Sequence, residues 1–190
     1  MAIDPRTSPE QATQLNSFGA ASLGAAVWQT RLAAAQKDFV QRTLALVRPL
    51  TIARAVPVRS LDGNTVDLRT SLQGPVTVVA FLSRFCAPAI EVIPDLQRLA
   101  TRLGQHGVRT VAIFNETSSS AELSAFLRKN DVSLPVLLDH DKSASNVFQQ
   151  WGTPYFYVVD GLGRIMSEPT SDVDELLIKA EAVRVSAASK

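Results

Sequence analysis

The chain has 190 residues, of which 46% are hydrophobic and 19% are charged, and its formal net charge is +1 at pH 7. This composition is ordinary for a globular protein with a sizeable core. A net charge so close to zero gives no electrostatic basis for binding nucleic acid, so we expect no nucleic-acid partner. One cysteine and two histidines exclude an internal disulfide framework, and their spacing indicates neither a metal site nor another cofactor.

The first 50 residues read as an extension of the main domain. Residues 1–8 indicate a disordered lead or a tag, which we leave out of the fold. Residues 9–50 are rich in Ala, Gln and Leu and have no internal proline before Pro49, which predicts a helical extension. The apolar stretch 18–28 is too short to span a bilayer and follows no basic segment, so we expect no signal sequence in this chain. The extension either packs on its own domain or offers a surface to a partner helix or a second copy.

Short strands and turns are predicted between the extension and residue 75. Residues 56–59 and 65–68 read as two strands, because Asp62-Gly63 between them is a strong turn signal. Pro57 has no N–H to donate to a neighbouring strand. We therefore expect the first of these strands to lie at an edge of its sheet.

The stretch of residues 76–103 contains the only cysteine of the chain. Residues 76–82 are apolar apart from Thr77, and they are long enough for one buried strand. Pro88 suits the first turn of a helix because its missing N–H is harmless there. Apolar residues then recur at helical spacing as far as Leu103. The pattern predicts a buried strand followed by one helix, with the cysteine between them.

Cys86 therefore lies where a strand ends and a helix begins. The positive end of the helix dipole stabilises a thiolate over a thiol at this position, and the charge of Arg84 would add to this effect. The sequence favours a reactive cysteine on these grounds. The alternative is an inert thiol that packs as a small hydrophobic side chain.

The remaining segments alternate between strand and helix patterns. We expect a buried strand at 108–114, a capped helix after 118–120, a short strand at 134–139 and a short helix at 143–150. A strand at 155–159 forms a hairpin with 164–167 through a Gly-rich turn, and a last helix begins near residue 171. This alternation predicts an α/β fold with a central mixed sheet and helices on both faces.

Two motifs resemble the thioredoxin-like superfamily. The family signature is an aromatic residue, C-x-P-C and a proline eight positions after the first cysteine, and Phe85–Ala89 with Pro94 resembles it. Residues 151–160 resemble the cis-proline loop of the family and the central strand that follows it. The resemblance implies a cis peptide bond between Thr153 and Pro154, and an X–Pro bond is the plausible place for one.

An additional helix-and-strand unit between the motifs, residues 118–139, resembles the TlpA/ResA/CcmG (redoxin) branch of membrane-tethered bacterial thiol–disulfide proteins. The resemblance covers residues 53–187, which we expect to form the thioredoxin-like domain. It implies a periplasmic or otherwise extracytoplasmic location and a protein disulfide or thiol as substrate. The site residues that it implies are Cys86 as nucleophile and, for substrate binding, Thr153, Pro154, Phe85 and Pro88.

The sequence departs from the family pattern at two positions. Ala89 stands where the second cysteine would be, and Ala80 stands where many thioredoxins carry a buried acid. One cysteine can form a mixed disulfide but cannot resolve it internally. The resemblance therefore implies a thiol–disulfide oxidoreductase-type protein with a single nucleophilic cysteine, either a natural monothiol member or a variant that traps its partner, with Arg84 and Ala89 as modulating residues.

Two other functions remain open at the level of the sequence. The first is a redox-inactive binding or assembly module that has the thioredoxin fold and acts through its N-terminal helix. The second is a peroxidase similar to the peroxiredoxin group, since Ser83 lies three residues before Cys86 as the hydroxyl residue of that group does. Val79 stands where that group has a proline.

Overall fold

An eight-stranded mixed sheet organises the residues that the computed structural model describes, which are 50–52, 54–115 and 119–188. The strand order is β1-β8-β7-β4-β5-β6-β2-β3. The strands in chain order are β1 Leu50–Thr51, β2 Pro57–Ser60, β3 Thr65–Asp67, β4 Val76–Leu82, β5 Val108–Phe114, β6 Val136–Leu138, β7 Tyr155–Asp160 and β8 Arg164–Ile165. The helices are α3 Leu68–Ser71, α4 Ala87–Glu91, α5 Ile93–Gly104, α6 Ser120–Lys129, α7 Ser143–Val147 and α8 Val173–Ala188.

Strand β4 is the central strand of the sheet. It pairs in parallel with β5 on one side and antiparallel with β7 on the other, and β5 continues in parallel to β6. All seven residues of β4 are buried. The hydroxyl of Thr77, its one polar side chain, donates a hydrogen bond to the carbonyl oxygen of Leu72 at 3.2 Å, so no polar group of this side chain is left unpaired in the core. The predicted mixed sheet is confirmed.

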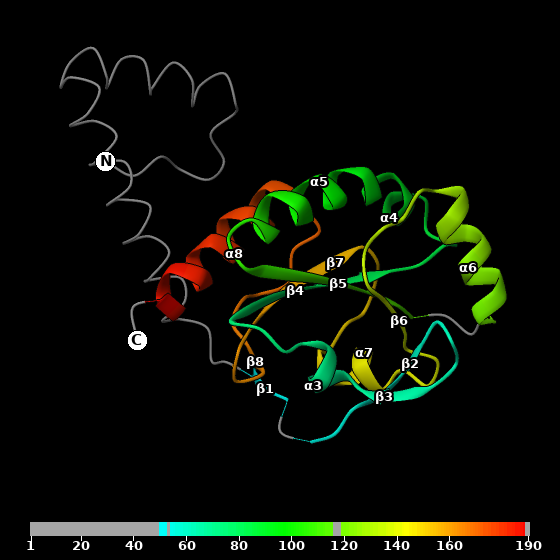
Figure 1. The fold of residues 1–190 in the computed structure, drawn as a ribbon, viewed down its shortest axis with the longest axis horizontal. Helices are drawn as coiled ribbons and strands as arrows, with labels where there is room; N and C mark the ends of the chain where they lie inside the picture. The colour runs from blue at the N-terminus through cyan, green and yellow to red at the C-terminus, as the bar shows by residue number, and fades with distance from the viewer. Residues whose placement is uncertain (1–49, 53, 116–118, 189–190) are drawn as a thin grey trace, which may run out of the picture. The chain divides into compact units, whose positions relative to one another are not determined.

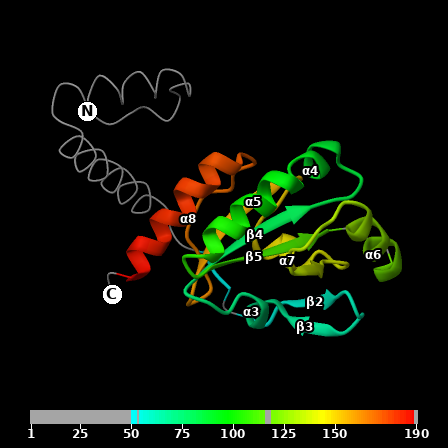
Figure 2. The same cartoon turned by 45° about the horizontal axis from the view of Figure 1, so that its top comes forward.

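Helices cover both faces of this sheet, as predicted (Figure 1). Helices α5 and α8 pack on one face, and α3 and α7 lie on the other. The second view shows β4 and β5 running toward the end of the sheet where α4 and α6 lie (Figure 2). Both strands therefore deliver the residues that follow them to the same end of the sheet.

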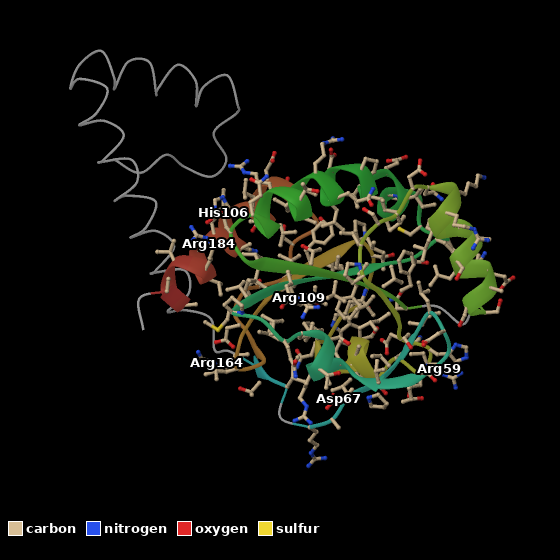
Figure 3. All side chains as sticks on the ribbon, in the orientation of Figure 1. Arg59, Asp67, His106, Arg109, Arg164 and Arg184 are labelled. Atoms are coloured by element: carbon tan, nitrogen blue, oxygen red, sulfur yellow. The ribbon has the colours of Figure 1, made fainter. Side chains whose placement is uncertain are left out.

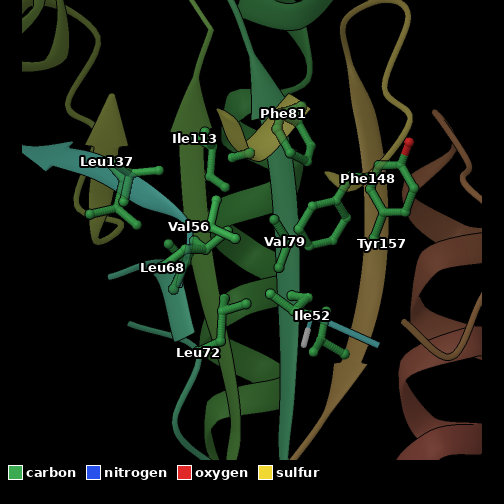
Figure 4. Close-up of a cluster of buried hydrophobic side chains, with 14 of the residues drawn as sticks. Ile52, Val56, Leu68, Leu72, Val79, Phe81, Ile113, Leu137, Phe148 and Tyr157 are labelled. Atoms are coloured by element: carbon green, nitrogen blue, oxygen red, sulfur yellow. The ribbon is translucent and has the colours of Figure 1, made fainter. Parts of the chain in front are cut away.

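An aromatic cluster holds α7 against the sheet. Phe81 of β4, Tyr157 of β7 and Phe148 after α7 meet edge to face, with ring centroids 5.0–5.7 Å apart (Figure 4). This arrangement suits the quadrupoles of the rings. Because side chains alternate along a strand, Ala80 faces the opposite side from Phe81. The core on the α3–α7 face is therefore independent of the position where many thioredoxins carry an acid.

The predicted helix after Cys86 is two helices. Helix α4 ends at Glu91, Val92 is the junction, and α5 begins at Ile93. Pro94 explains the break, because it has no N–H to donate to the carbonyl oxygen four residues earlier and its ring crowds that turn. The prediction of one continuous helix was wrong, and the cysteine precedes a helix of only five residues.

The prediction that Pro57 marks an edge strand was also wrong. Strand β2 lies between β6 and β3, and β3 forms the edge. Pro57 is tolerated because it is the first residue of β2, and the ladder with β6 reaches only Arg59 and Ser60. The short elements β1 and α3 were not predicted, because two and four residues are too few to establish a periodic pattern.

The predictions for the lead 1–8 and the helical extension 9–50 fall almost entirely outside the described residues. The described residues all belong to the unit that spans Val47–Lys190. None of the described helices is long and apolar enough to cross a membrane.

Candidate active site

A tight turn places Cys86 at the end of β4. The N–H of Phe85 donates to Oγ of Ser83 at 3.2 Å, and the N–H of Cys86 donates to the Ser83 carbonyl oxygen at 3.3 Å. Cys86 is the N-cap residue of α4, with an extended backbone, and its carbonyl oxygen accepts the Ile90 N–H at 3.1 Å. Its side chain is partly exposed. The hydroxyl oxygen of Ser83 thus stabilises the turn that carries Cys86.

The loop before β7 meets this turn. Because β7 pairs antiparallel with β4 and Tyr155 lies opposite Phe81, the residues just before Tyr155 lie at the same end of the sheet as Cys86. The Thr153–Pro154 peptide bond is cis. The thiol of Cys86 donates a hydrogen bond from Sγ to the carbonyl oxygen of Thr153 at 3.1 Å. Residues 67 positions apart in the chain are thereby in contact.

Arg84 connects the cysteine turn to α6. Its guanidinium lies 3.6 Å from a carboxylate oxygen of Glu122 and 4.4 Å from the ring centroid of Phe85. Glu122 also forms a capping box with Ser119 at the start of α6. Hydrogen bonds from the backbone and side chain of Ser119, and then the charge of Arg84, hold the pKa of Glu122 below its ordinary value. Arg84 therefore anchors the turn and covers one face of the Phe85 ring.

The other predicted site residues differ in their exposure. Phe85 is 73% exposed and Pro88 is exposed, while Thr153 and Pro154 are half-buried. Ala89 is only 1% exposed. The position of the missing second cysteine thus faces the protein interior, one helical turn after the thiol.

The sequence analysis did not identify Asn115 and Gln150 as residues that support the site. The side-chain amide of Asn115, which follows β5, donates to the side-chain carbonyl of Gln150 at 3.1 Å. The N–H of Gln150 donates to the Ser145 carbonyl oxygen of α7 at 2.9 Å. These bonds fix the loop just before its cis bond. Asn and Gln in loops are too common for the sequence to single out this pair.

Trp151 is the second feature that the sequence did not single out for a role. It follows Gln150 directly and is 93% exposed. The next residue, Gly152, packs against the ring of Tyr155, because a Cβ at position 152 would lie 3.2 Å from the Tyr155 ring. The sequence signal that could have indicated an exposed ring is the position of this tryptophan directly before the short loop segment Gly152–Pro154.

A surface groove lies away from the thiol. It has a volume of about 560 Å³ and runs between α5 and the start of α8, with Val92, Leu99, Asp172 and Leu177 among its lining residues. None of the residues that line it belongs to the Cys86 turn or the cis-proline loop. Within the described part of the chain, no group of three or more His, Cys, Asp or Glu side chains could hold a metal ion.

The central sheet with helices on both faces has the thioredoxin-like fold, and Cys86 lies at the end of its strand β4. Residues 51–167, more than half of the chain, match the AhpC/TSA family, and the chain belongs to that family. The family and the fold are of the thiol–disulfide oxidoreductase type.

Among curated proteins, the chain is similar to two thiol-disulfide oxidoreductases named ResA. The ResA of Halalkalibacterium halodurans is 20% identical over 122 residues, which are 64% of this chain and 68% of that protein. The ResA of Bacillus subtilis is 22% identical over 117 residues, which are 62% of this chain and 64% of that protein.

Solved structures share the fold. The thiol:disulfide interchange protein DsbE from Chlorobium tepidum has a TM-score of 0.61 and 17% identity, and the match covers 73% of this chain and 99% of that one. DsbF of Mycobacterium tuberculosis has a TM-score of 0.57 and 22% identity, covering 67% and 93%. A secreted disulfide oxidoreductase of Mycobacterium tuberculosis has a TM-score of 0.52 and 22% identity, covering 69% and 94%.

Proposed function

We propose that this protein performs thiol–disulfide exchange with a single nucleophilic cysteine, Cys86, and holds its partner in a mixed disulfide. The observation that supports it most is the thiol itself. Cys86 is partly exposed, it begins a helix, and its Sγ lies 3.1 Å from the carbonyl oxygen of Thr153 in the cis-proline loop. A passive core cysteine would be buried among apolar side chains.

In the proposed reaction, the Cys86 thiolate attacks one sulfur of a partner disulfide. The bond between the two partner sulfurs breaks, a bond between Cys86 and the attacked sulfur forms, and the second sulfur leaves as a thiolate and takes up a proton. The proton of Cys86 is lost to solvent before the attack. The carbonyl oxygen of Thr153 then no longer accepts from the thiol and is free to accept from another donor. Because position 89 carries alanine, release of the partner requires a thiol from another molecule.

Four residues around the thiol would form the substrate platform. Thr153 and Pro154 border Cys86 from the cis-proline loop, and Phe85 and Pro88 flank it in the chain. The exposure of Phe85 and Pro88 supports this role, because both side chains are accessible to a partner. The substrate that we propose is a protein thiol or disulfide, consistent with the oxidoreductases that the chain resembles.

The Ala89→Cys variant tests this function. Its second thiol would lie one helical turn after Cys86 and resolve the mixed disulfide, so we expect it to reduce a model disulfide with dithiothreitol at least about tenfold faster than the unaltered chain. Ala89→Ser is the matched control, because serine has nearly the same size and carries no thiol. The proposal loses its support if the Ala89→Cys variant is no faster than this control.

We also propose an extracytoplasmic location. One structural neighbour, at 22% identity, is a secreted disulfide oxidoreductase. The environment outside the cytoplasm is where partner disulfides persist. The alternative of a binding module that acts through the N-terminal helix is not favoured, because the curated relatives are thiol-disulfide oxidoreductases.

A further inference from the structure

Two exposed aromatic side chains belong to the two loops that meet at the thiol. Phe85 is 73% exposed and Trp151 is 93% exposed. Phe85 is the neighbour of Cys86, and Trp151 lies two residues before Thr153, whose carbonyl oxygen accepts the thiol hydrogen bond. Two residues of chain span at most about 7 Å. Both rings therefore originate close to the sulfur, from two different loops.

The backbones that carry these rings are held in place. The guanidinium of Arg84 lies over the Phe85 ring at 4.4 Å and pairs with Glu122 of α6. On the other loop, the hydrogen bonds of Gln150 to Asn115 and Ser145 precede Trp151, and the packing of Gly152 on Tyr155 follows it. Trp151 is thus a solvent-exposed indole on a fixed loop. This is the arrangement of a preformed contact surface, because little order has to be gained on binding.

The thiol that lies beside both loops determines which molecule can cover these side chains. A partner whose cysteine reacts with Cys86 places the residues next to that cysteine over the two loops. In an extended segment these residues lie about 3.3 Å apart along the chain, so the first or second neighbour of the partner cysteine can lie about as far from the sulfur as the backbone of Trp151 does. An indole gains most from apolar contact and is the side chain most enriched among residues that dominate binding energy.

We infer that Trp151 is a specificity-determining residue, and that it selects polypeptide partners with an apolar side chain beside the reacting cysteine over small hydrophilic disulfides. The inference rests on the proposed exchange function. It goes further by naming the class of partner and the side chain that selects it. The cis-proline loop would then recognise a partner side chain through Trp151 in addition to lying against the thiol.

The test compares three disulfides that release the same chromophore when Cys86 attacks them. Two are extended peptides whose cysteine is joined to 5-thio-2-nitrobenzoate, one with leucines and one with serines beside that cysteine. The third is the corresponding disulfide of glutathione. In each reaction Cys86 bonds to the peptide sulfur and thionitrobenzoate leaves, so the second-order rate constant is read from the released colour.

We expect the unaltered chain to react at least about tenfold faster with the leucine peptide than with the serine peptide or glutathione. Trp151→Ala reduces this ratio to near one, and Trp151→Phe retains most of it. Leu162→Ala is the matched control: Leu162 is 73% exposed in the β7–β8 turn, at the opposite end of β7 from the cis-proline loop. This control leaves the ratio unchanged.

The outcomes separate the two proposals. Equal rates with all three disulfides, or a ratio that survives Trp151→Ala, would overturn the selective role of Trp151 and leave the exchange function standing. A ratio that falls as far in Leu162→Ala would also overturn it. Absence of reaction with every disulfide would overturn the exchange function, and the inference with it.

Discussion

The two ends of the central sheet differ in the side chains that they carry and in how these are paired. At the end where β7 turns into β8, Asp160 accepts hydrogen bonds from the N–H groups of Leu162 and Arg164 and forms an ion pair with the Arg164 guanidinium. Arg164 is labelled in Figure 3. At the end that carries Cys86, a thiol is partly exposed and two aromatic rings face solvent. The first end is held by a buried, paired carboxylate, and the second carries, besides its own polar pairs, a partly exposed thiol.

Glycine allows close packing at both ends, since Gly152 packs on the Tyr155 ring at the thiol end. At the β7–β8 end, Gly161 approaches the strand start so closely that an added Cβ would lie 3.0 Å from the Gly74 carbonyl oxygen. At the thiol end, the turn that carries Cys86 has a side chain, Phe85, that could be removed without opening the core. If Cys86 performs the proposed exchange, stability and reactivity lie at opposite ends of the same strands, and variants at each end can test this separation.

The largest effect on stability is expected from Asp160→Ala. The carboxylate is buried and accepts from Leu162 N–H at 3.0 Å and from the Arg164 backbone N–H and Nε at 3.0 and 2.7 Å. Its loss leaves these donors without their acceptor, so the free energy of unfolding should fall by about 2–3 kcal/mol. Urea denaturation measures this change.

The same variant should leave the reaction of Cys86 with a small disulfide unchanged under native conditions. Asp160→Asn, which retains an acceptor oxygen, should be destabilised less than Asp160→Ala. A reaction rate that falls in parallel with stability would contradict the separation of the two ends.

A smaller effect is expected at high pH. Burial, followed by the nearby Tyr155 and Glu168, raises the pKa of Tyr157 from 10.0 to about 12. Between these values the unfolded chain loses the phenol proton while the folded chain retains it, so the free energy of unfolding falls as pH rises above 10. The stabilisation is fully present well below pH 10. At pH 11 the free energy of unfolding should be lower by about 1 kcal/mol.

Urea midpoints at pH 8 and pH 11 test this expectation for the unaltered chain and for Tyr157→Phe. The variant cannot ionise at this position, so its midpoint should fall less between the two pH values. Equal losses in both proteins would show that Tyr157 does not contribute to the alkaline sensitivity.

The smallest effect on stability is expected from Phe85→Ala. Because the ring is 73% exposed, its removal should change the free energy of unfolding by no more than about 0.5 kcal/mol. Capture of a polypeptide disulfide by Cys86 should nevertheless slow severalfold. Leu162→Ala, with the same exposed fraction at the other end, should alter neither quantity. If Phe85→Ala lowered the free energy of unfolding by more than about 1.5 kcal/mol, Phe85 would contribute to the stability of the fold, and this prediction would be wrong.

The sequence was most informative where the pattern is long and uniform. The bounds of β4 and β5 match the predicted ranges, because an apolar run buried on both faces and bounded by glycine or proline has few alternatives. The break at Val92 and the inner position of β2 were predicted incorrectly. Pro57 was weighed by its general preference for edge strands, although its place at the start of β2 decided the outcome. The effect of Pro94 on the helix was not considered in the prediction.

The site was predictable only in part. The position of Cys86 between a strand and a helix followed from local pattern, but its contact with Thr153 joins residues 67 apart and depends on strand order. The pairing of Arg84 with Glu122 depends likewise on where α6 lies. The exposure of Trp151 depends on how distant parts of the chain pack around it, and the local sequence pattern does not show this packing.

The exposed position of Trp151 also gives the protein an optical label. The chain has two tryptophans, and the other one, Trp28, can be replaced by phenylalanine to leave a single emitter. An indole in water emits at longer wavelengths than one covered by apolar atoms, so the emission of Trp151 would shift to the blue when a partner settles on the loop. The arrival of a partner on the loop could then be timed in a stopped-flow trace, without attaching any dye.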